Sequence, residues 1–133
     1  MRYEYLEHTA DVKFRAYGKD LDEAFCNAAY ALKNVLSTDE VESKVSKKID
    51  IKAEDEKSLL YDFLEWFIIA LDSEDFILGK IKNLEIKNNS LKAEVFGDSV
   101  EKYEIHTHIK APTYQEMEIV KDDKVMVQVV VDH

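Results

Sequence analysis

The chain has 133 residues, of which 46% are hydrophobic and 35% are charged, and its formal net charge is −10. A chain of this size buries roughly two thirds of its unfolded surface in one domain, residues 1–133, which excludes a disordered or membrane-embedded protein. The acidic balance disfavours direct binding to the phosphates of nucleic acid and suits cations or a basic protein partner.

The N-terminal residues and the cysteine content predict a cytoplasmic protein. The N-terminal residues lack the apolar run that a signal peptide requires, so none is expected. No stretch of the sequence reaches the roughly 20 apolar residues of a membrane span. The single cysteine, Cys26, excludes an internal disulfide and fits a reducing compartment. Because Cys26 lies in a predicted helix, a small buried side chain is favoured over a nucleophile.

Two short strands and a helix are predicted at the start of the chain. Residues 3–7 and 12–17 are the strands, the second with the alternation of a half-buried strand, and residues 7–11 form a polar turn between them. Asp20 is the expected N-cap of a helix over residues 21–36, whose apolar face is rich in alanine.

The most apolar stretch, residues 58–71 (SLLYDFLEWFIIAL), predicts a buried helix. Its apolar residues follow the i, i+3, i+4, i+7 spacing, and its last two turns are apolar almost all round. Asp55 or Ser58 is the expected N-cap. A strand over residues 44–53 precedes this helix, and we expect the helix to lie under a sheet.

The rest of the chain is predicted to form strands. Residues 79–87 and 90–96 flank an Asn-Asn dipeptide, which tolerates the positive φ of a tight hairpin. Residues 103–111 alternate as a strand, and Pro112 then requires an edge or a bulge. The pairing resumes through Met117 and Ile119 up to a turn at residues 122–123, and residues 125–131, apolar on both faces, predict a central strand. The order β-β-α-β-α-β-β-β-β defines an α+β domain with two helices and mostly antiparallel sheets.

The first candidate site is the polar turn. His8 and Asp11 could bind a metal or transfer protons, whereas Thr9 and Asp11 could instead satisfy the backbone groups of the turn. The spacing alone favours the second interpretation.

The second candidate site is the C-terminus. Asp132 stands directly before the terminal carboxylate of His133, and two such anions repel each other unless a cation neutralises them. If the final strand runs beside the strand that begins at Asp11, these oxygens converge on a hard site suited to calcium, magnesium or manganese. Asp39 could complete it, although the end of a helix disfavours an unneutralised carboxylate.

The third candidate site surrounds Lys110. Lys110 shares the polar face of its predicted strand with His106 and His108. A solvated lysine is the ordinary interpretation, and a lysine held near a phosphate or a partner's carboxylate is the alternative. The two histidines could hold a metal, but a satisfied polar pair is favoured.

Four motifs together resemble the archease family. They are HTADV at residues 8–12, LLYDFL at residues 59–64, IKA with TY within residues 109–114, and QVVVD at residues 128–132. The motifs extend over nearly the whole chain in the family's order and at compatible spacing. The combination is specific, whereas each motif alone is weak.

The resemblance implies an archease-like fold and an accessory protein rather than an enzyme. Archeases assist the RtcB-type ligase, which joins tRNA halves after intron removal: they promote guanylylation of the ligase and allow multiple turnover. The family's metal site, with calcium as the usual ion, corresponds to Asp11, Asp132 and His133. Asp39 fits another functional aspartate of the family, and Lys110 fits the lysine thought to act at the ligase.

Three positions depart from the family's pattern. Pro112 and Gln115 interrupt the usual Lys-Ala-Val-Thr-Tyr-His run, and Tyr103 stands where a histidine is often found. These departures weaken a role for the two histidine positions and leave Lys110 and the carboxylates intact. The terminal His133 replaces a more usual aliphatic residue.

Three functions are weighed for the chain. An activator of the RtcB-type ligase ranks first, since an acidic helper is steered to the basic cleft that an RNA ligase requires. Its aspartates would handle the divalent ion used in guanylylation, and Lys110 would offset phosphate charge. A chaperone-like assembly factor for RNA-processing enzymes ranks second. A metal-dependent hydrolase ranks last, because three glycines are too few for a phosphate-cradling loop.

Overall fold

The computed structural model describes residues 1–8 and 11–133, so Thr9 and Ala10 of the predicted turn lie outside the described residues. The described residues form seven strands, two long helices and one short 3-10 helix. In chain order these are β1 (Tyr3–Leu6), β2 (Val12–Gly18), α1 (Leu21–Leu36), β3 (Val45–Lys52), α2 (Glu56–Glu74), β4 (Phe76–Lys87), β5 (Ser90–Ser99), η1 (Val100–Lys102), β6 (Ala111–Lys121) and β7 (Val125–Asp132).

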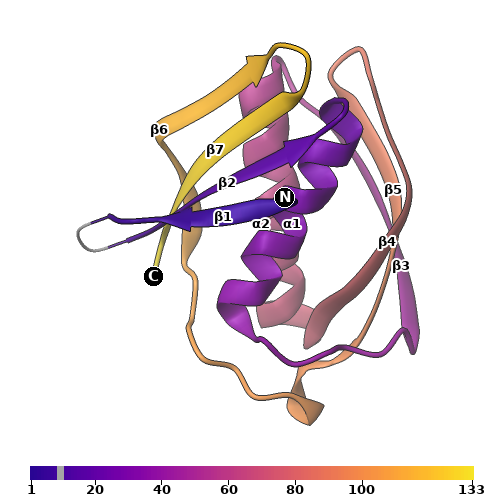
Figure 1. The fold of residues 1–133 in the computed structure, drawn as a ribbon. Coiled ribbons are helices and arrows are strands. Elements are labelled where there is room, and N and C mark those ends of the chain that lie inside the picture. The colour runs from indigo at the N-terminus through magenta and orange to yellow at the C-terminus, as the bar shows by residue number, and fades with distance from the viewer. Residues whose placement is uncertain (9–10) are drawn as a thin grey trace.

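The strands form two antiparallel sheets with the helices between them. One sheet has the order β1-β2-β7-β6, and the other has the order β3-β5-β4. Figure 1 shows the two sheets on opposite sides of α1 and α2, so the helices lie between the sheets. The predicted α+β class, the two helices and the order of the elements are confirmed. No helix in the described ranges is long and apolar enough to span a membrane.

Side-chain caps begin both helices. The Asp20 carboxylate accepts a hydrogen bond of 2.9 Å from the Glu23 N–H, which confirms the predicted cap of α1. At α2 the cap is Asp55, whose carboxylate accepts from the Ser58 N–H at 2.8 Å. Helix α2 is buried along most of its length, but Ile69 is 54% exposed, so one stripe of the predicted buried helix faces outward.

The predicted central strand, hairpin and edge are also confirmed. Strand β7 pairs with β2 on one side and with β6 on the other, as expected for a strand that is apolar on both faces. Asn88 and Asn89 have φ of 52° and 59° in the turn between β4 and β5. Pro112 lies in β6, at the edge of its sheet, where a missing N–H is tolerated.

The predicted strand over residues 103–111 is wrong for all but its last residue. Strand β6 begins at Ala111, and the preceding segment crosses from one sheet to the other (Figure 1). Two of its N–H groups pair near the end of α1 instead of with a strand: that of His106 donates to the Leu36 carbonyl at 2.8 Å, and that of Glu104 donates to the Asp39 carboxylate at 2.9 Å. These bonds replace a sheet ladder.

Candidate functional site

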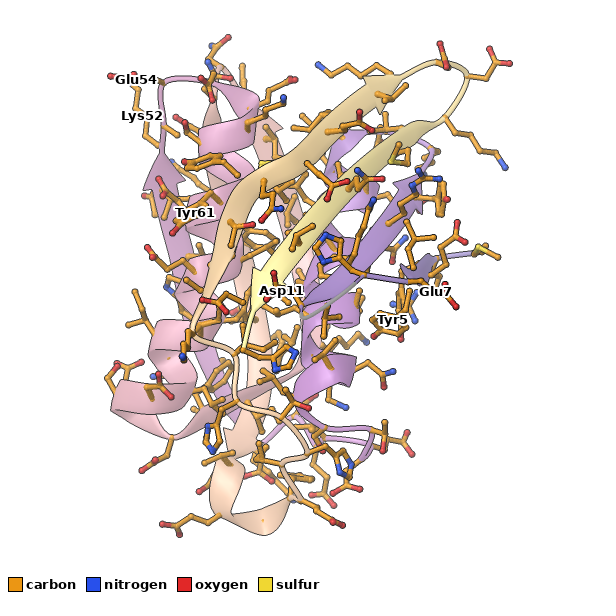
Figure 2. The ribbon with its side chains drawn as sticks, turned by 90° about the vertical axis from the view of Figure 1, so that its left-hand side faces the viewer. Tyr5, Glu7, Asp11, Lys52, Glu54 and Tyr61 are labelled. Carbon is orange, nitrogen blue, oxygen red and sulfur yellow. The ribbon has the colours of Figure 1, made fainter. Side chains whose placement is uncertain are left out.

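The pairing of β2 with β7 brings the first turn beside the last residues of the chain. Val12 lies opposite Val131 across this antiparallel pair. Asp11 directly precedes Val12 and Asp132 directly follows Val131, so both aspartates lie at the same end of the two strands. Figure 2 shows Asp11 at the end of β7, in agreement with this register. Both aspartates are half-buried, and the exposed His133 comes next.

Lys110 joins these residues from a third segment. Its N–H donates a hydrogen bond of 2.7 Å to the main-chain oxygen of Asp132. Ala111 then pairs with Asp132 in the sheet, which fixes the position of the Lys110 backbone beside the end of β7. The Lys110 side chain is exposed. The fold therefore brings one lysine and two aspartates together at one end of the four-stranded sheet.

Asp39 is held by other contacts. Its carboxylate accepts from the Glu104 N–H, and its main-chain oxygen accepts from the Lys33 ammonium. Lys33 therefore places a positive charge at the end of α1, where the lone carboxylate was expected to be unfavourable. Within residues 1–8 and 11–133, no three or more His, Cys, Asp or Glu side chains gather in a metal-binding group. The structure thus places Asp11 and Asp132 at the same end of two paired strands, whereas the contacts of Asp39 are with Lys33 and Glu104 near the end of α1.

The donor types at this end of the sheet fit a hard cation. Carboxylate and main-chain oxygens are the ligands that calcium prefers, and calcium takes about six to eight of them. Asp11, Asp132 and a main-chain oxygen of His133 could supply part of such a shell. Two acidic side chains do not close a cage, so other oxygen ligands would have to complete the coordination.

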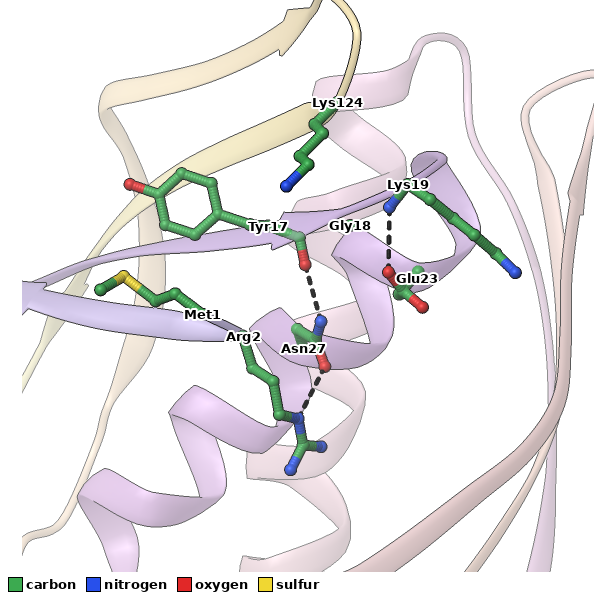
Figure 3. Close-up of a pocket in the computed structure, with 8 residues that line it drawn as sticks. All are labelled: Met1, Arg2, Tyr17, Gly18, Lys19, Glu23, Asn27 and Lys124. Carbon is green, nitrogen blue, oxygen red and sulfur yellow. Dashed lines mark hydrogen bonds between the residues drawn. The ribbon is translucent and has the colours of Figure 1, made fainter.

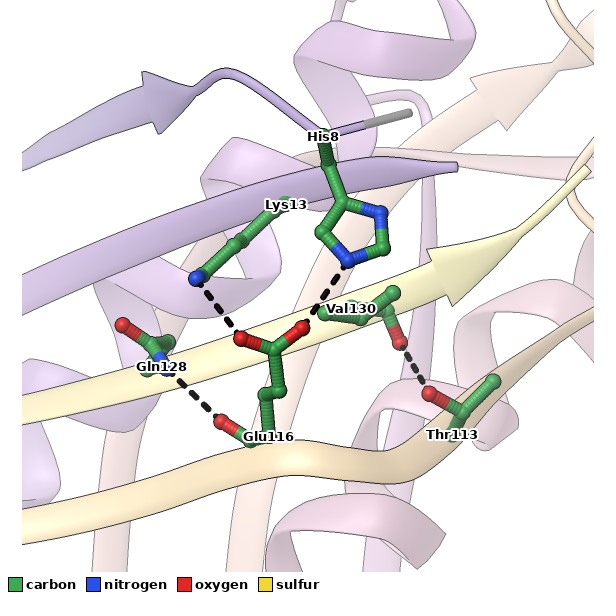
Figure 4. A network of polar contacts seen from close by, with 6 residues as sticks. All are labelled: His8, Lys13, Thr113, Glu116, Gln128 and Val130. Atoms are coloured by element: carbon green, nitrogen blue, oxygen red, sulfur yellow. Dashed lines mark hydrogen bonds and ion pairs between the residues drawn. The ribbon is translucent and has the colours of Figure 1, made fainter. Parts of the chain in front are cut away.

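His8 lies in a separate polar network, shown in Figure 4. His8 Nε2 is 2.9 Å from one carboxylate oxygen of Glu116, and Lys13 Nζ donates to the other at 3.1 Å. The contact with His8 and then that with Lys13 hold the pKa of Glu116 below its ordinary value of 4.5. Among the described residues, His8 therefore takes part in an ion-pair network with Glu116 and Lys13.

Sequence reasoning did not find Glu116. This residue has φ of 54° and lies where the register of β6 against β7 shifts. Its carbonyl accepts a hydrogen bond of 2.7 Å from Gln128, and Gln128 in turn accepts one of 2.8 Å from Arg15. A positive φ is uncommon for glutamate, and the strand alternation gives no sign of it. A polar Gln128 inside the apolar run of β7 is the one signal that could have indicated a bulge beside it.

The two histidines of the crossing segment do not act as a pair. Because residues 103–110 are not a strand, His106 and His108 do not share the face of a sheet. His106 Nε2 lies 3.3 Å from the Thr38 hydroxyl, close to the end of α1. The two histidines therefore do not form the pair that the strand alternation suggested, and His106 makes a structural contact with Thr38 instead.

Tyr103 also has a structural role. Its hydroxyl donates to the Asp98 carboxylate at 2.8 Å and accepts from the Glu42 N–H at 3.0 Å. Burial raises the pKa of Asp98, but the hydrogen bonds from the Ser99 N–H, Tyr103 and Lys102 outweigh burial and lower it. Tyr103 thus helps to hold a buried carboxylate in its charged form.

A cavity of about 620 Å³ lies at the opposite end of β2 and β7 (Figure 3). Three hydrogen bonds link residues of its lining: Arg2 donates to Asn27 at 3.2 Å, Asn27 donates to the Tyr17 carbonyl at 2.6 Å, and the Lys19 N–H donates to Glu23 at 2.9 Å. Because these partners are satisfied and lie far along the strands from Asp11, the cavity is not part of the candidate site.

The single thiol is not activated. Burial, and then nearby carboxylates, raise the pKa of Cys26 to about 11, so the thiol stays protonated near neutral pH. This agrees with the prediction that Cys26 is a packing residue.

The sequence and the fold both match the archeases. The sequence pattern described as the Archease protein family (MTH1598/TM1083) matches residues 3–132. The archease of Sulfolobus acidocaldarius is 38% identical over 126 residues, spanning 92% of this chain and 91% of that protein. The archease of Pyrococcus abyssi is 39% identical over 140 residues, spanning 98% of each chain.

Two solved structures have the same fold. The solution structure of Methanobacterium thermoautotrophicum protein 1598 superposes with a TM-score of 0.83 at 34% identity, covering 99% of both chains. The crystal structure of a Thermotoga maritima protein, described as "an archease, possible chaperone", has a TM-score of 0.63 at 21% identity and covers 96% of this chain and 94% of its own, which shows the fold alone. The family pattern and the curated relatives together show that this chain belongs to the archease family.

Proposed function

We propose that this archease activates an RtcB-type tRNA-splicing ligase and catalyses no reaction of its own. The observation that carries the proposal is the meeting of Asp11, Lys110 and Asp132, which come from three separate segments, at one end of the sheet. In this proposal the group acts at the nucleotide site of the ligase, promoting its guanylylation and its multiple turnover in tRNA ligation. Family membership supports an archease function, and the contacts of these residues support the site.

Asp11, Asp132 and a main-chain oxygen of His133 would hold a divalent cation. Calcium is favoured for an all-oxygen site, with magnesium and manganese as alternatives. When bound, the ion would supply positive charge that offsets the repulsion between the two aspartates. The pairing of β2 with β7 holds the two residues at neighbouring positions before any ion arrives.

Lys110 would face the phosphates of the nucleotide at the ligase. Its backbone is fixed by the hydrogen bond to Asp132 while its side chain extends into solvent, so its ammonium is free to reach a partner. A lysine so placed neutralises negative charge that develops during nucleotidyl transfer. Asp39 would act indirectly, because its carboxylate ties Glu104 to the end of α1 and so directs the segment that leads to Lys110.

The charge of the chain supports a protein partner rather than RNA. A net charge of −10 favours encounter with the basic cleft of an RNA ligase and opposes direct contact with RNA phosphates. The cytoplasm is the compartment in which we place this activity, together with the ligase.

The test measures guanylylation and turnover of an RtcB-type ligase with and without the protein. Wild-type protein should raise both, and Asp132→Ala or Lys110→Ala should lower the activation at least about tenfold, because each removes a charged group from the site. Asp123→Ala and Lys48→Ala, which change exposed residues away from the site, serve as matched controls and should activate fully. Normal activation by Asp132→Ala would contradict the proposal.

A structural role for the ion has a distinct signature. If the ion only fastens the last residues to the first turn, calcium should raise the melting temperature of the wild type and not that of Asp132→Ala. Activation of the ligase would then be the same for both proteins. That combination would remove the ion from the activating mechanism and keep it as a stabilising ligand.

A chaperone-like assembly factor is the second candidate. Exposed apolar side chains such as Ile69 and Tyr114, each 54% exposed, favour it, as does the description of the Thermotoga maritima protein as a possible chaperone. It predicts suppression of aggregation for several unrelated RNA-processing enzymes, whereas the activator predicts an effect on one ligase. Phosphate-ester hydrolysis by the purified protein alone would favour the third candidate, a hydrolase.

A further inference from the structure

Two stacked tyrosines lie open to solvent between α2 and β6. The rings of Tyr61 and Tyr114 are 4.6 Å apart at their centroids and inclined by 12°, and Tyr114 is 54% exposed. Tyr61 covers one side of the Tyr114 ring, and more than half of the Tyr114 surface remains in water. Tyrosine is enriched among the residues that dominate protein–protein binding, because its ring is large, rigid and amphipathic.

The exposed stripe of α2 continues this aromatic pair. Tyr61, Glu65 and Ile69 follow each other at four-residue intervals, which places them on one face of the helix, and Ile69 is 54% exposed. Asp62 is half-buried beside Tyr61. Burial, and then the charge of Glu65, raise the pKa of Tyr61, which agrees with a carboxylate close to the ring. We call Tyr61, Asp62, Glu65, Ile69 and Tyr114 the tyrosine face.

The tyrosine face adjoins the candidate site. Tyr114 lies near the start of strand β6, four residues after Lys110. In the view of Figure 2, Tyr61 lies on the far side of β6 from Asp11, which lies at the end of β7. A partner that reaches Lys110 and Asp11 would therefore extend over Tyr114 as well.

We propose that the tyrosine face docks a basic, arginine-bearing surface of the partner protein, with a guanidinium stacked on the open side of the Tyr114 ring. This inference rests on the proposed function, since it names the surface by which the ligase is held. Arginine stacks on aromatic rings more readily than lysine does, and neighbouring basic groups would face Asp62 and Glu65. A nucleic-acid base could stack on the same ring, but its phosphates would meet two carboxylates on a protein of charge −10.

The affinity of an RtcB-type ligase for variants of this chain tests the inference. Tyr114→Ala should weaken the Kd at least about tenfold, because it removes an exposed interface anchor. Tyr114→Phe keeps the ring and should stay within about threefold, since stacking needs no hydroxyl. The control Val120→Ala changes a side chain on the same strand that is 39% exposed, and it should leave the Kd unchanged.

A charge-reversed variant separates docking from folding. Glu65→Lys should also weaken the Kd about tenfold, and its effect should shrink at high salt. Because both altered residues reach solvent, the melting temperatures of Tyr114→Ala and Glu65→Lys should remain close to the wild-type value, which excludes loss of structure. Guanylylation at saturating concentrations of each variant should approach the wild-type rate, since Lys110 and Asp132 are unchanged.

Each result decides the inference. Wild-type affinity in both Tyr114→Ala and Glu65→Lys overturns it. A labelled single-stranded RNA that binds the wild type and loses binding in Tyr114→Ala, while the affinity for the ligase is unchanged, overturns it in favour of base stacking. If the wild type neither binds nor activates the ligase, the proposed function itself fails. If the wild type activates and only the docking variants behave as wild type, the docking surface alone is wrong.

Discussion

Gln128→Leu tests whether one buried amide holds the bulge of β6. Gln128 is 4% exposed in β7, where its neighbours in the strand are valines. Its side chain donates to the Glu116 carbonyl at 2.7 Å and accepts from Arg15 at 2.8 Å (Figure 4 shows the first bond). Leucine has a similar size and supplies neither bond. The substitution therefore removes the polar contacts while keeping the packed volume.

The expected cost follows from those two contacts. The lost hydrogen bonds of Gln128, one of them from a charged donor, cost about 3 kcal/mol together. Leucine buries slightly more apolar surface than glutamine and returns about 1 kcal/mol. The net destabilisation is about 2 kcal/mol, which for 133 residues lowers the melting temperature by about 7 °C.

Urea unfolding followed by the fluorescence of Trp66, the only tryptophan, measures this cost. Gln115→Leu is the matched control, because it makes the same change at an exposed position of β6 and should alter stability by less than about 0.5 kcal/mol. Equal stability of Gln128→Leu and the wild type would refute the reasoning. An equal loss in both variants would refute it too, since the effect would then not depend on the bulge.

Two further predictions concern the ion pair and a helix cap. Because His8 and Lys13 hold the pKa of Glu116 below its ordinary value of 4.5, their contribution to stability is present above pH 4.5 and is lost as the pH falls through the folded pKa. Glu116→Gln should therefore flatten the acid side of the stability profile, measured by thermal melts at stepwise lower pH, and an unchanged profile would contradict this. Asp20→Ala removes the cap of α1 and should lower the free energy of unfolding by about 1 kcal/mol, whereas Asp20→Ser should retain most of it in the same urea titration.

The elements that the sequence predicts correctly depend on local patterns. Helix α2 has apolar residues at helical spacing, and the Asn-Asn turn needs only two residues of suitable conformation. The apolar run of β7 on both faces predicts its central place, because only a strand with neighbours on either side buries both faces. The sequence does not itself place β7 beside β2, and the structure supplies this pairing, which brings Asp11 and Asp132 to the same end of the sheet.

The error over residues 103–110 shows what alternation measures. Ile105, Thr107 and Ile109 are less exposed than the residues between them, as the predicted strand required. The alternation therefore gives the correct buried side, but it says nothing about the partners of the backbone. Those partners are Leu36 and Asp39 at the end of α1, which lie more than sixty residues away in the chain. A single sequence carries no signal for such a pairing.

Glu116 and Asp39 illustrate a second limit. The positive φ of Glu116 is stabilised by Gln128, His8 and Lys13, none of which is near it in sequence. The sequence places Asp39 just after the first helix, but it gives no sign that the Asp39 carboxylate accepts a hydrogen bond from the Glu104 N–H in the crossing segment. Charge identifies candidates for a site, and only the tertiary contacts decide which candidates are together.

Two departures from the family's pattern, Pro112 and Tyr103, have structural roles. Pro112 lies in the edge strand β6, where the loss of one N–H is tolerated, and its register opposite Val131 is intact. Tyr103 binds Asp98 and the Glu42 N–H, contacts that join β5 to the chain before β3. Neither change alters the hydrogen bond between Lys110 and Asp132. We therefore expect the proposed activation to depend on Lys110 and Asp132 rather than on the two histidine positions, and the alanine variants of these two residues test this expectation.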